Sequence, residues 1–199
     1  MKLSSEIIGA FTLAVCTVLG GAWFIIGSAN ERTQEEATQP VETVIETAYK
    51  YTVQMGYIVP EGDTSFKSYM DYRCITNQSS DQYKLQNDCW TDADGLRRYG
   101  DDYVIAIGSY YADSIGDRLD ITLDSGEEFT AIVGDFKADI HTDKTNRFTR
   151  MENGNKNVIE FVVDTDALDS TARRMGDISY ISGFSGNVES IVAENGEKW

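Results

Sequence analysis

Apolar positions divide the chain into a long charge-free segment near the N-terminus and a series of short runs further on. No charged residue occurs from Ile7 to Asn30, and this run is long enough for a membrane-spanning helix, which needs about 20 residues. The alternative is a cleaved secretory signal, because Gly27, Ser28 and Ala29 form a small-residue stretch typical of a cleavage site. The apolar run is longer than the roughly 7–15 residues of a signal core, so the pattern predicts a transmembrane anchor over residues 1–29.

The charges that flank this segment predict its orientation. Lys2 precedes the span, whereas a mostly acidic group follows it, made up of Glu31, Arg32, Glu35 and Glu36. Positively charged flanks stay on the cytoplasmic side. We therefore expect a single-pass protein of the cell membrane, inserted through residues 7–29, with its C-terminal part outside the cytoplasm. A cleaved signal would instead give a secreted protein.

The remainder of the chain divides into a tether and one domain. Residues 30–40 are polar, with no apolar periodicity, which is typical of a solvated tether. Residues 41–199 form the predicted extracytoplasmic domain, with an N-terminal extension over 41–100. Apolar residues between 41 and 48 recur at helical spacing and predict a short amphipathic helix, and 51–60 is expected to be extended.

Beyond residue 100 the pattern predicts a mainly β fold with short helices. Short β-branched or aromatic runs bounded by Gly, Asp and Asn occur at 103–107, 119–123, 129–133, 158–163, 178–181 and 188–192. Asp124 to Glu127 is expected to form a hairpin turn, and 167–175 one short helix. Strands at this spacing favour a sandwich or small barrel. Glycine-aspartate pairs at 116–117 and 176–177 are each expected to open a strand, which suggests two similar halves.

Charge and cysteine content exclude several classes of function. A formal net charge of −16 repels nucleic-acid phosphates, so nucleic acid is not an expected partner. Cys16 lies in the predicted span, which leaves Cys74 and Cys89 as either a disulfide or two buried free thiols. His141 is the only histidine and no C-x-x-C spacing occurs, so we expect neither a zinc site nor another cofactor.

Residues 103–108, 115–121, Gly126, 131–135 and 158–164 resemble double-psi β-barrels. The most similar patterns are those of three-aspartate (3D) domains and of the catalytic barrel in membrane-bound lytic transglycosylases. The resemblance implies a small six-stranded barrel that acts on peptidoglycan. In those families a cleft aspartate protonates the glycosidic oxygen and a hydroxyl of the sugar closes an anhydro ring. That aspartate corresponds to Asp135, and Asp164 corresponds to a later aspartate that shapes the cleft. The Asp-Thr-Gly-Gly core of the family is absent.

Residues near Asp135 complete the candidate site. Asp139 and Asp143 follow Asp135 in one loop, where they either join the site or simply solvate an exposed loop. Their four-residue spacing does not fit the alternating ligands of an EF-hand calcium site. The remaining candidates can hydrogen-bond a sugar or a peptide carboxylate, or stack on a sugar ring: Lys144, Arg147, Tyr110 and Tyr111.

These patterns predict a membrane-anchored cell-envelope protein that binds or cleaves peptidoglycan or another envelope glycan. Asp135 is the expected acid and base of a lytic transglycosylase-like reaction. The alternative is a non-catalytic binding or assembly module of the cell surface.

Overall fold

The structure, a computed structural model, describes residues 56–193 and Trp199. The anchor, the tether and the helix expected at 41–48 lie outside these residues. Within the described part, no helix has the length and apolar character needed to cross a membrane.

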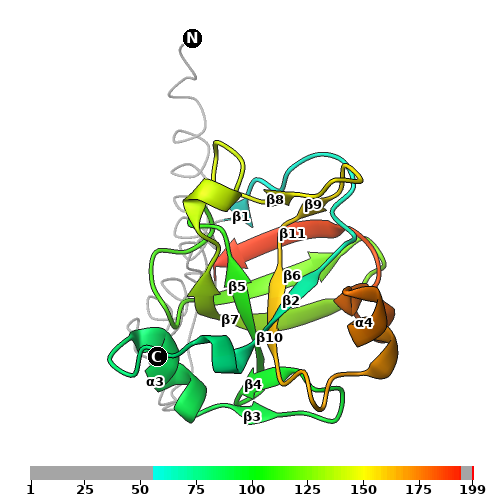
Figure 1. Ribbon diagram of the computed structural model, residues 1–199. Helices are drawn as coiled ribbons and strands as arrows, with labels where there is room; N and C mark the ends of the chain where they lie inside the picture. The colour runs from blue at the N-terminus through cyan, green and yellow to red at the C-terminus, as the bar shows by residue number, and fades with distance from the viewer. Residues whose placement is uncertain (1–55, 194–198) are drawn as a thin grey trace, which may run out of the picture. The chain divides into compact units, whose positions relative to one another are not determined.

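One mixed sheet organises the domain, as Figure 1 shows. Its main path follows the order β1-β11-β6-β7-β5-β10-β2, and the β3-β4 pair is attached to β5. Neighbouring strands are antiparallel except for β5 with β7 and β10 with β2, which are parallel. The strands of this sheet are β1 (Gly56–Tyr57), β2 (Ser68–Asp71), β3 (Trp90–Thr91), β4 (Arg97–Tyr99), β5 (Asp102–Ile107), β6 (Arg118–Leu123), β7 (Glu128–Phe136), β10 (Glu160–Val163) and β11 (Val188–Ala193).

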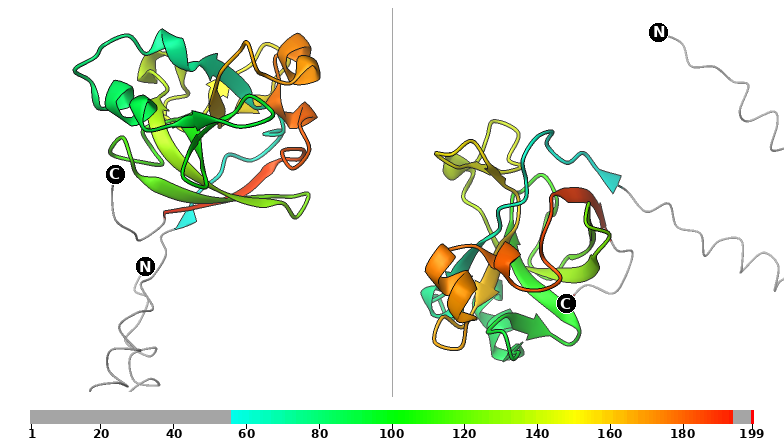
Figure 2. Two further views of the ribbon diagram at one scale, coloured as in Figure 1. Left: turned by 90° about the horizontal axis from the view of Figure 1, so that it is seen from below. Right: turned by 90° about the vertical axis from the view of Figure 1, so that its right-hand side faces the viewer.

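Smaller elements surround the sheet. Strands β8 (Thr149–Arg150) and β9 (Lys156–Asn157) form a separate hairpin. The helices are α3 (Asp81–Asn87) and α4 (Ser170–Met175), with 3-10 turns η1 (Tyr72–Cys74), η2 (Asp139–His141) and η3 (Ile178–Tyr180). The predicted mainly β fold with short helices is therefore confirmed. Figure 2 shows β6, β7 and β11 curving around one side of the domain, and no hydrogen-bonded pairing closes the described strands into a barrel.

Alternation along the strands builds the core. In β6, Leu119, Ile121 and Leu123 are buried while the residues between them are partly exposed. Tyr103, Phe129, Phe161 and Phe184 pack edge-on or tilted at ring-centroid distances of 4.9 to 6.0 Å. A second, smaller cluster lies on the other face, where Leu85 of α3 covers one residue from each of three strands: Val104, Ile132 and Val162. Strand β5 is consequently buried on both faces.

Local signals for the hairpin and for one helix are confirmed. The turn between β6 and β7 is closed by a hydrogen bond from the Leu123 N–H to the Glu127 carbonyl (2.8 Å), and Gly126 has a φ of +88°. Helix α4 occupies the second half of the run expected to be helical. It begins after Asp169, whose side chain accepts hydrogen bonds from two N–H groups of the first turn.

The expectation of a strand at 178–181 is wrong. Residues Ile178–Tyr180 form the turn η3, because the Asp177 side chain accepts a hydrogen bond from the Ser179 N–H (2.9 Å) and curls the backbone. Ile178 still enters the core. The glycine-aspartate pair at 116–117 does precede a strand, β6, but the pair at 176–177 does not.

Candidate functional site

Asp135 belongs to a row of three residues across the middle of the sheet. Ala106 on β5 pairs with Asp135 on β7 and, on its other side, with Glu160 on β10. Cross-strand partners point to the same face of a sheet, so both acidic residues flank the small alanine. We call Asp135, Ala106 and Glu160 the carboxylate row.

A β-bulge turns Asp135 toward this face. The register of β5 against β7 shifts between Ile105, which pairs with Val133, and Ala106, which pairs with Asp135, so Gly134 is the extra residue. Gly134 suits this position because a Cβ there would lie 2.2 Å from the Val104 Cγ1. Val133 points into the core, whereas Asp135 lies on the face covered by α3.

The two carboxylates of the row have different surroundings. Glu160 Oε2 lies 3.8 Å from Lys137 Nζ, and the Lys137 side chain is only 2% exposed. Burial lowers the pKa of Lys137 to about 8, against the opposing effect of Glu160. Asp135 Oδ1 accepts a hydrogen bond from the Phe136 N–H (2.9 Å) and a long one from the Gln82 amide (3.5 Å). Within the described residues Asp135 forms no ion pair, so only Glu160 has a cation beside it.

The other two aspartates of the loop do not join Asp135. Asp139 is exposed at the start of η2 and accepts a hydrogen bond from the Ser109 hydroxyl (2.9 Å). Asp143 closes its own loop by accepting hydrogen bonds from the N–H groups of Thr145, Arg147 and Phe148. Burial raises the pKa of Asp143, but these hydrogen bonds outweigh it and leave the pKa below its usual value. No cluster of metal-ligating side chains occurs in the part that the structure describes.

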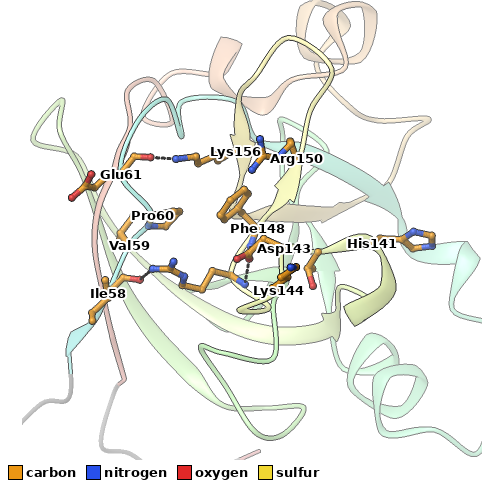
Figure 3. Close-up of a pocket in the computed structure, with 12 residues that line it drawn as sticks. Ile58, Val59, Pro60, Glu61, His141, Asp143, Lys144, Phe148, Arg150 and Lys156 are labelled. Carbon is orange, nitrogen blue, oxygen red and sulfur yellow. Dashed lines mark hydrogen bonds between the residues drawn. The ribbon is translucent and has the colours of Figure 1, made fainter.

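A groove of about 780 Å³ lies beside the β8–β9 hairpin. It is lined by residues 58–61, by most of loop 141–148, and by Arg150 and Lys156. Figure 3 shows Ile58 and Glu61 on one wall, with Phe148, Asp143 and Lys144 across from them. Of the predicted site residues, Asp143, Lys144 and Arg147 line this groove, and Asp135 does not. The structure thus separates the proposed acid from the predicted cations.

The groove loop is held tightly against the end of β5. A Cβ on Gly108 would lie 1.9 Å from the Asn146 carbonyl oxygen, so only glycine allows this approach. The same oxygen accepts a hydrogen bond from the Tyr110 N–H (3.4 Å). Arg147 Nε donates to the Thr145 hydroxyl (2.7 Å), and its Nη1 donates to the Ile58 carbonyl (3.5 Å).

One of the two predicted tyrosines is exposed and the other is buried. They follow β5 in a turn instead of lying on a strand. Tyr110 is 37% exposed, and the Arg147 guanidinium lies 5.8 Å from the centre of its ring. Tyr111 is fully buried in the core, and burial raises the pKa of its hydroxyl. The prediction that Tyr111 contacts a substrate is therefore wrong, while Tyr110 is available beside the groove.

The remaining candidates lie elsewhere. Asp164 directly follows β10, whereas the groove residue Lys156 precedes this strand, so Asp164 lies away from the groove. Its Oδ1 lies 3.6 Å from the Arg73 guanidinium group. Cys74 and Cys89 are both free thiols, but Cys74 is exposed and Cys89 is half-buried, so they form neither a disulfide nor a pair of buried thiols. Cys89 Sγ donates to the Leu85 carbonyl (3.1 Å), and burial raises the pKa of this thiol to about 11.

Several residues of the two sites were not predicted from the sequence, among them Glu160, Arg150 and Lys156. Glu160 is the one charged residue in the apolar run 158–163, a signal that was present but was read only as part of a strand. Its pairing with Ala106 depends on long-range register, which no local pattern reveals. Arg150 and Lys156 continue the basic series that begins at Lys144, and this density of cations in an acidic chain was a usable signal.

Comparison with known proteins gives no relative for this chain. No protein-family model matches it, and neither a curated protein nor a solved structure shows significant similarity.

Proposed function

We propose that this chain is a membrane-anchored cell-envelope protein that cleaves peptidoglycan in the manner of a lytic transglycosylase. Residues 7–29 provide the anchor, and the domain acts outside the cytoplasm. The observation that carries the proposal is the carboxylate row, in which Asp135 and Glu160 flank Ala106 on one face of the sheet. Strands lie about 4.8 Å apart, so the two backbones are roughly 10 Å apart, with only a methyl group between the side chains.

The different surroundings of the two carboxylates suit a division of roles. Asp135 has no ion-pair partner among the described residues, whereas Glu160 lies beside the buried Lys137 ammonium group. Asp135 is then the acid that protonates the glycosidic oxygen, and the leaving sugar departs with the electrons of the broken bond. The sugar that keeps the anomeric carbon then attacks this carbon with its own hydroxyl group, which closes the anhydro ring and returns a proton to Asp135. Glu160, which lies beside the Lys137 ammonium group, stabilises the positive charge that develops on the sugar ring.

The strand pairing supports a double-psi barrel as the finer description of the fold. Two parallel pairs, β5 with β7 and β10 with β2, occur in an otherwise antiparallel sheet. We assign one parallel pair to each half of such a barrel.

The test is to incubate the full chain, in a non-ionic detergent, with purified peptidoglycan and to identify the soluble products by mass spectrometry. We expect anhydro-sugar fragments from the wild type, and a loss of at least about 100-fold in Asp135→Asn, the usual effect of removing a general acid. Asp139→Asn is the matched control, since the Asp139 side chain is exposed and, within the described structure, accepts a hydrogen bond only from Ser109. Absence of anhydro products from the wild-type chain would contradict the proposal.

A non-catalytic binding module is the second candidate. It is favoured by the separation between Asp135 and the groove that contains Lys144 and Arg147. In that case the wild type sediments with peptidoglycan but releases no fragments, and Asp135→Asn is retained equally well.

A further inference from the structure

We propose that the groove between residues 58–61 and loop 141–148 is a docking site for an acidic peptide segment of a partner protein. The segment carries apolar side chains next to its carboxylates. This inference does not depend on glycan cleavage, because the groove and the carboxylate row are built from different residues.

Four cationic side chains line the groove. None of Lys144, Arg147, Arg150 and Lys156 forms an ion pair with a described carboxylate. The chain has 33 acidic and 17 basic residues, so partners are plentiful. Five basic residues elsewhere in the described structure do form ion pairs: Arg73, Lys84, Arg98, Arg118 and Lys137. Glu61 and Asp143 also line the groove, so its four cations outnumber its two carboxylates and leave a local positive charge, which attracts carboxylates.

Two of these cations are already oriented by hydrogen bonds to backbone carbonyl groups. Arg147 donates to the Ile58 carbonyl (3.5 Å), and Lys156 donates to the Glu61 carbonyl. Figure 3 shows Ile58 and Glu61, whose carbonyl groups accept these hydrogen bonds, on the same wall. Backbone contacts leave further donors of each head group for a ligand, and an arginine binds a carboxylate with two parallel hydrogen bonds. Lys144 and Arg150 are exposed, so a ligand in solution can reach them.

Exposed apolar side chains favour a peptide as the ligand. Large apolar side chains are exposed in or next to this groove. Ile58 lines it and is 68% exposed, Ile140 precedes the lining residue His141 and is 87% exposed, and Tyr110 lies beside the lining residue Arg147 and is 37% exposed. Exposed apolar side chains beside charged ones are typical of protein-binding surfaces. A phosphate polymer or a bare sugar acid offers charge but no apolar group for Ile58 and Ile140. A peptide with alternating acidic and apolar residues satisfies both.

The test uses the full chain in a non-ionic detergent and a short peptide of alternating leucine and glutamate with a neutral fluorophore. Fluorescence anisotropy gives the dissociation constant. The key variant is the double substitution Lys144→Glu with Arg150→Glu, since neither side chain makes a contact with described residues that the change would break. The matched control is Arg174→Glu, an exposed cation on α4.

We expect the double variant to bind the peptide at least about tenfold more weakly than the wild type, and the control to bind normally. A leucine-glutamine peptide should not bind, and a serine-glutamate peptide should bind more weakly than the leucine-glutamate one. Equal binding by the wild type and the double variant would overturn the proposal. Stronger binding of inorganic tripolyphosphate than of the leucine-glutamate peptide would also overturn it, because the groove would then be a phosphate site.

Discussion

The carboxylate row and the cationic groove differ in how the fold places their charged groups. Asp135 and Glu160 are fixed by the hydrogen-bonded register of three strands, with one bulge to set their direction. The groove is built mainly from loops, with Arg150 and Lys156 contributed by the β8–β9 hairpin. Loop 141–148 is held by the approach of Gly108 to Asn146 and by the hydrogen bonds to Asp143. Chemistry that needs exact geometry is best served by the sheet, whereas capture of a charged segment tolerates loops.

The lysines of the two sites make the same contrast. Lys137 is buried beside Glu160, so its charge acts on a carboxylate of the row. Lys144 is exposed and has no carboxylate partner among the described residues, so its charge is directed to solvent. If this contrast is correct, substitutions in one site should leave the function of the other intact.

The largest expected effect comes from filling the space between the two carboxylates. Ala106→Val adds two methyl groups between Asp135 and Glu160, while valine remains favourable in a strand. We expect release of peptidoglycan fragments to fall by about 100-fold, because displacement of reacting groups by about 1 Å has an effect of that order. Binding of the acidic peptide should not change.

Ala138→Val is the control for this substitution, since Ala138 is exposed. Thermal unfolding checks that the Ala106→Val chain is folded. A folded Ala106→Val chain with wild-type turnover would show that the carboxylate row is not the site of cleavage.

A second substitution should affect the groove and spare the row. Gly108→Ala places a Cβ against the Asn146 carbonyl and must displace the groove loop, at a cost of about 1–3 kcal/mol in the free energy of unfolding. We expect weaker peptide binding with nearly unchanged turnover. Gly56→Ala is the control, because a Cβ there meets no atom within 4 Å. Normal peptide binding by Gly108→Ala would mean that the loop position does not matter.

The smallest effect concerns pH and the buried lysines. Burial lowers the pKa of both Lys67 and Lys137 to about 8 in the folded state, below the value of about 10.4 in the unfolded chain. Between these values the unfolded chain binds more protons, so stability should rise with pH, by on the order of 2 kcal/mol from about pH 8 to 9.5. Above about pH 10 the raised pKa of buried Tyr111 opposes the rise.

Chemical denaturation at several pH values measures this effect. Lys137→Met should reduce the rise, whereas Lys144→Met, at an exposed position, should leave it unchanged. A rise that is identical in the wild type and in Lys137→Met would contradict the role of the buried lysine in the row.

Local patterns predicted most of the sheet but only part of the two sites. The alternation of Leu119, Ile121 and Leu123 is written directly in the sequence, and so is the turn at Gly126. The run at 178–181 has similar composition, yet the capping side chain of Asp177 turns it into η3. Composition alone cannot rank a capping hydrogen bond against a strand.

The sites depend on register and burial, which are long-range properties. Glu160 was missed because its position opposite Ala106 follows from the pairing of β10 with β5. Tyr111 was expected to contact a sugar, but it lies in the turn after β5 and its side chain is buried in the core. Lys144 and Arg147 both line the groove, because they are close in sequence and lie in one loop.

The most direct measurement compares the peptidoglycan fragments released by three proteins under the same conditions: the wild type, Asp135→Asn, and the double variant of Lys144→Glu with Arg150→Glu. Mass spectrometry should find anhydro-sugar fragments from the wild type and the double variant, and almost none from Asp135→Asn. Release of these fragments by Asp135→Asn at the wild-type rate would contradict the assignment of catalysis to the carboxylate row.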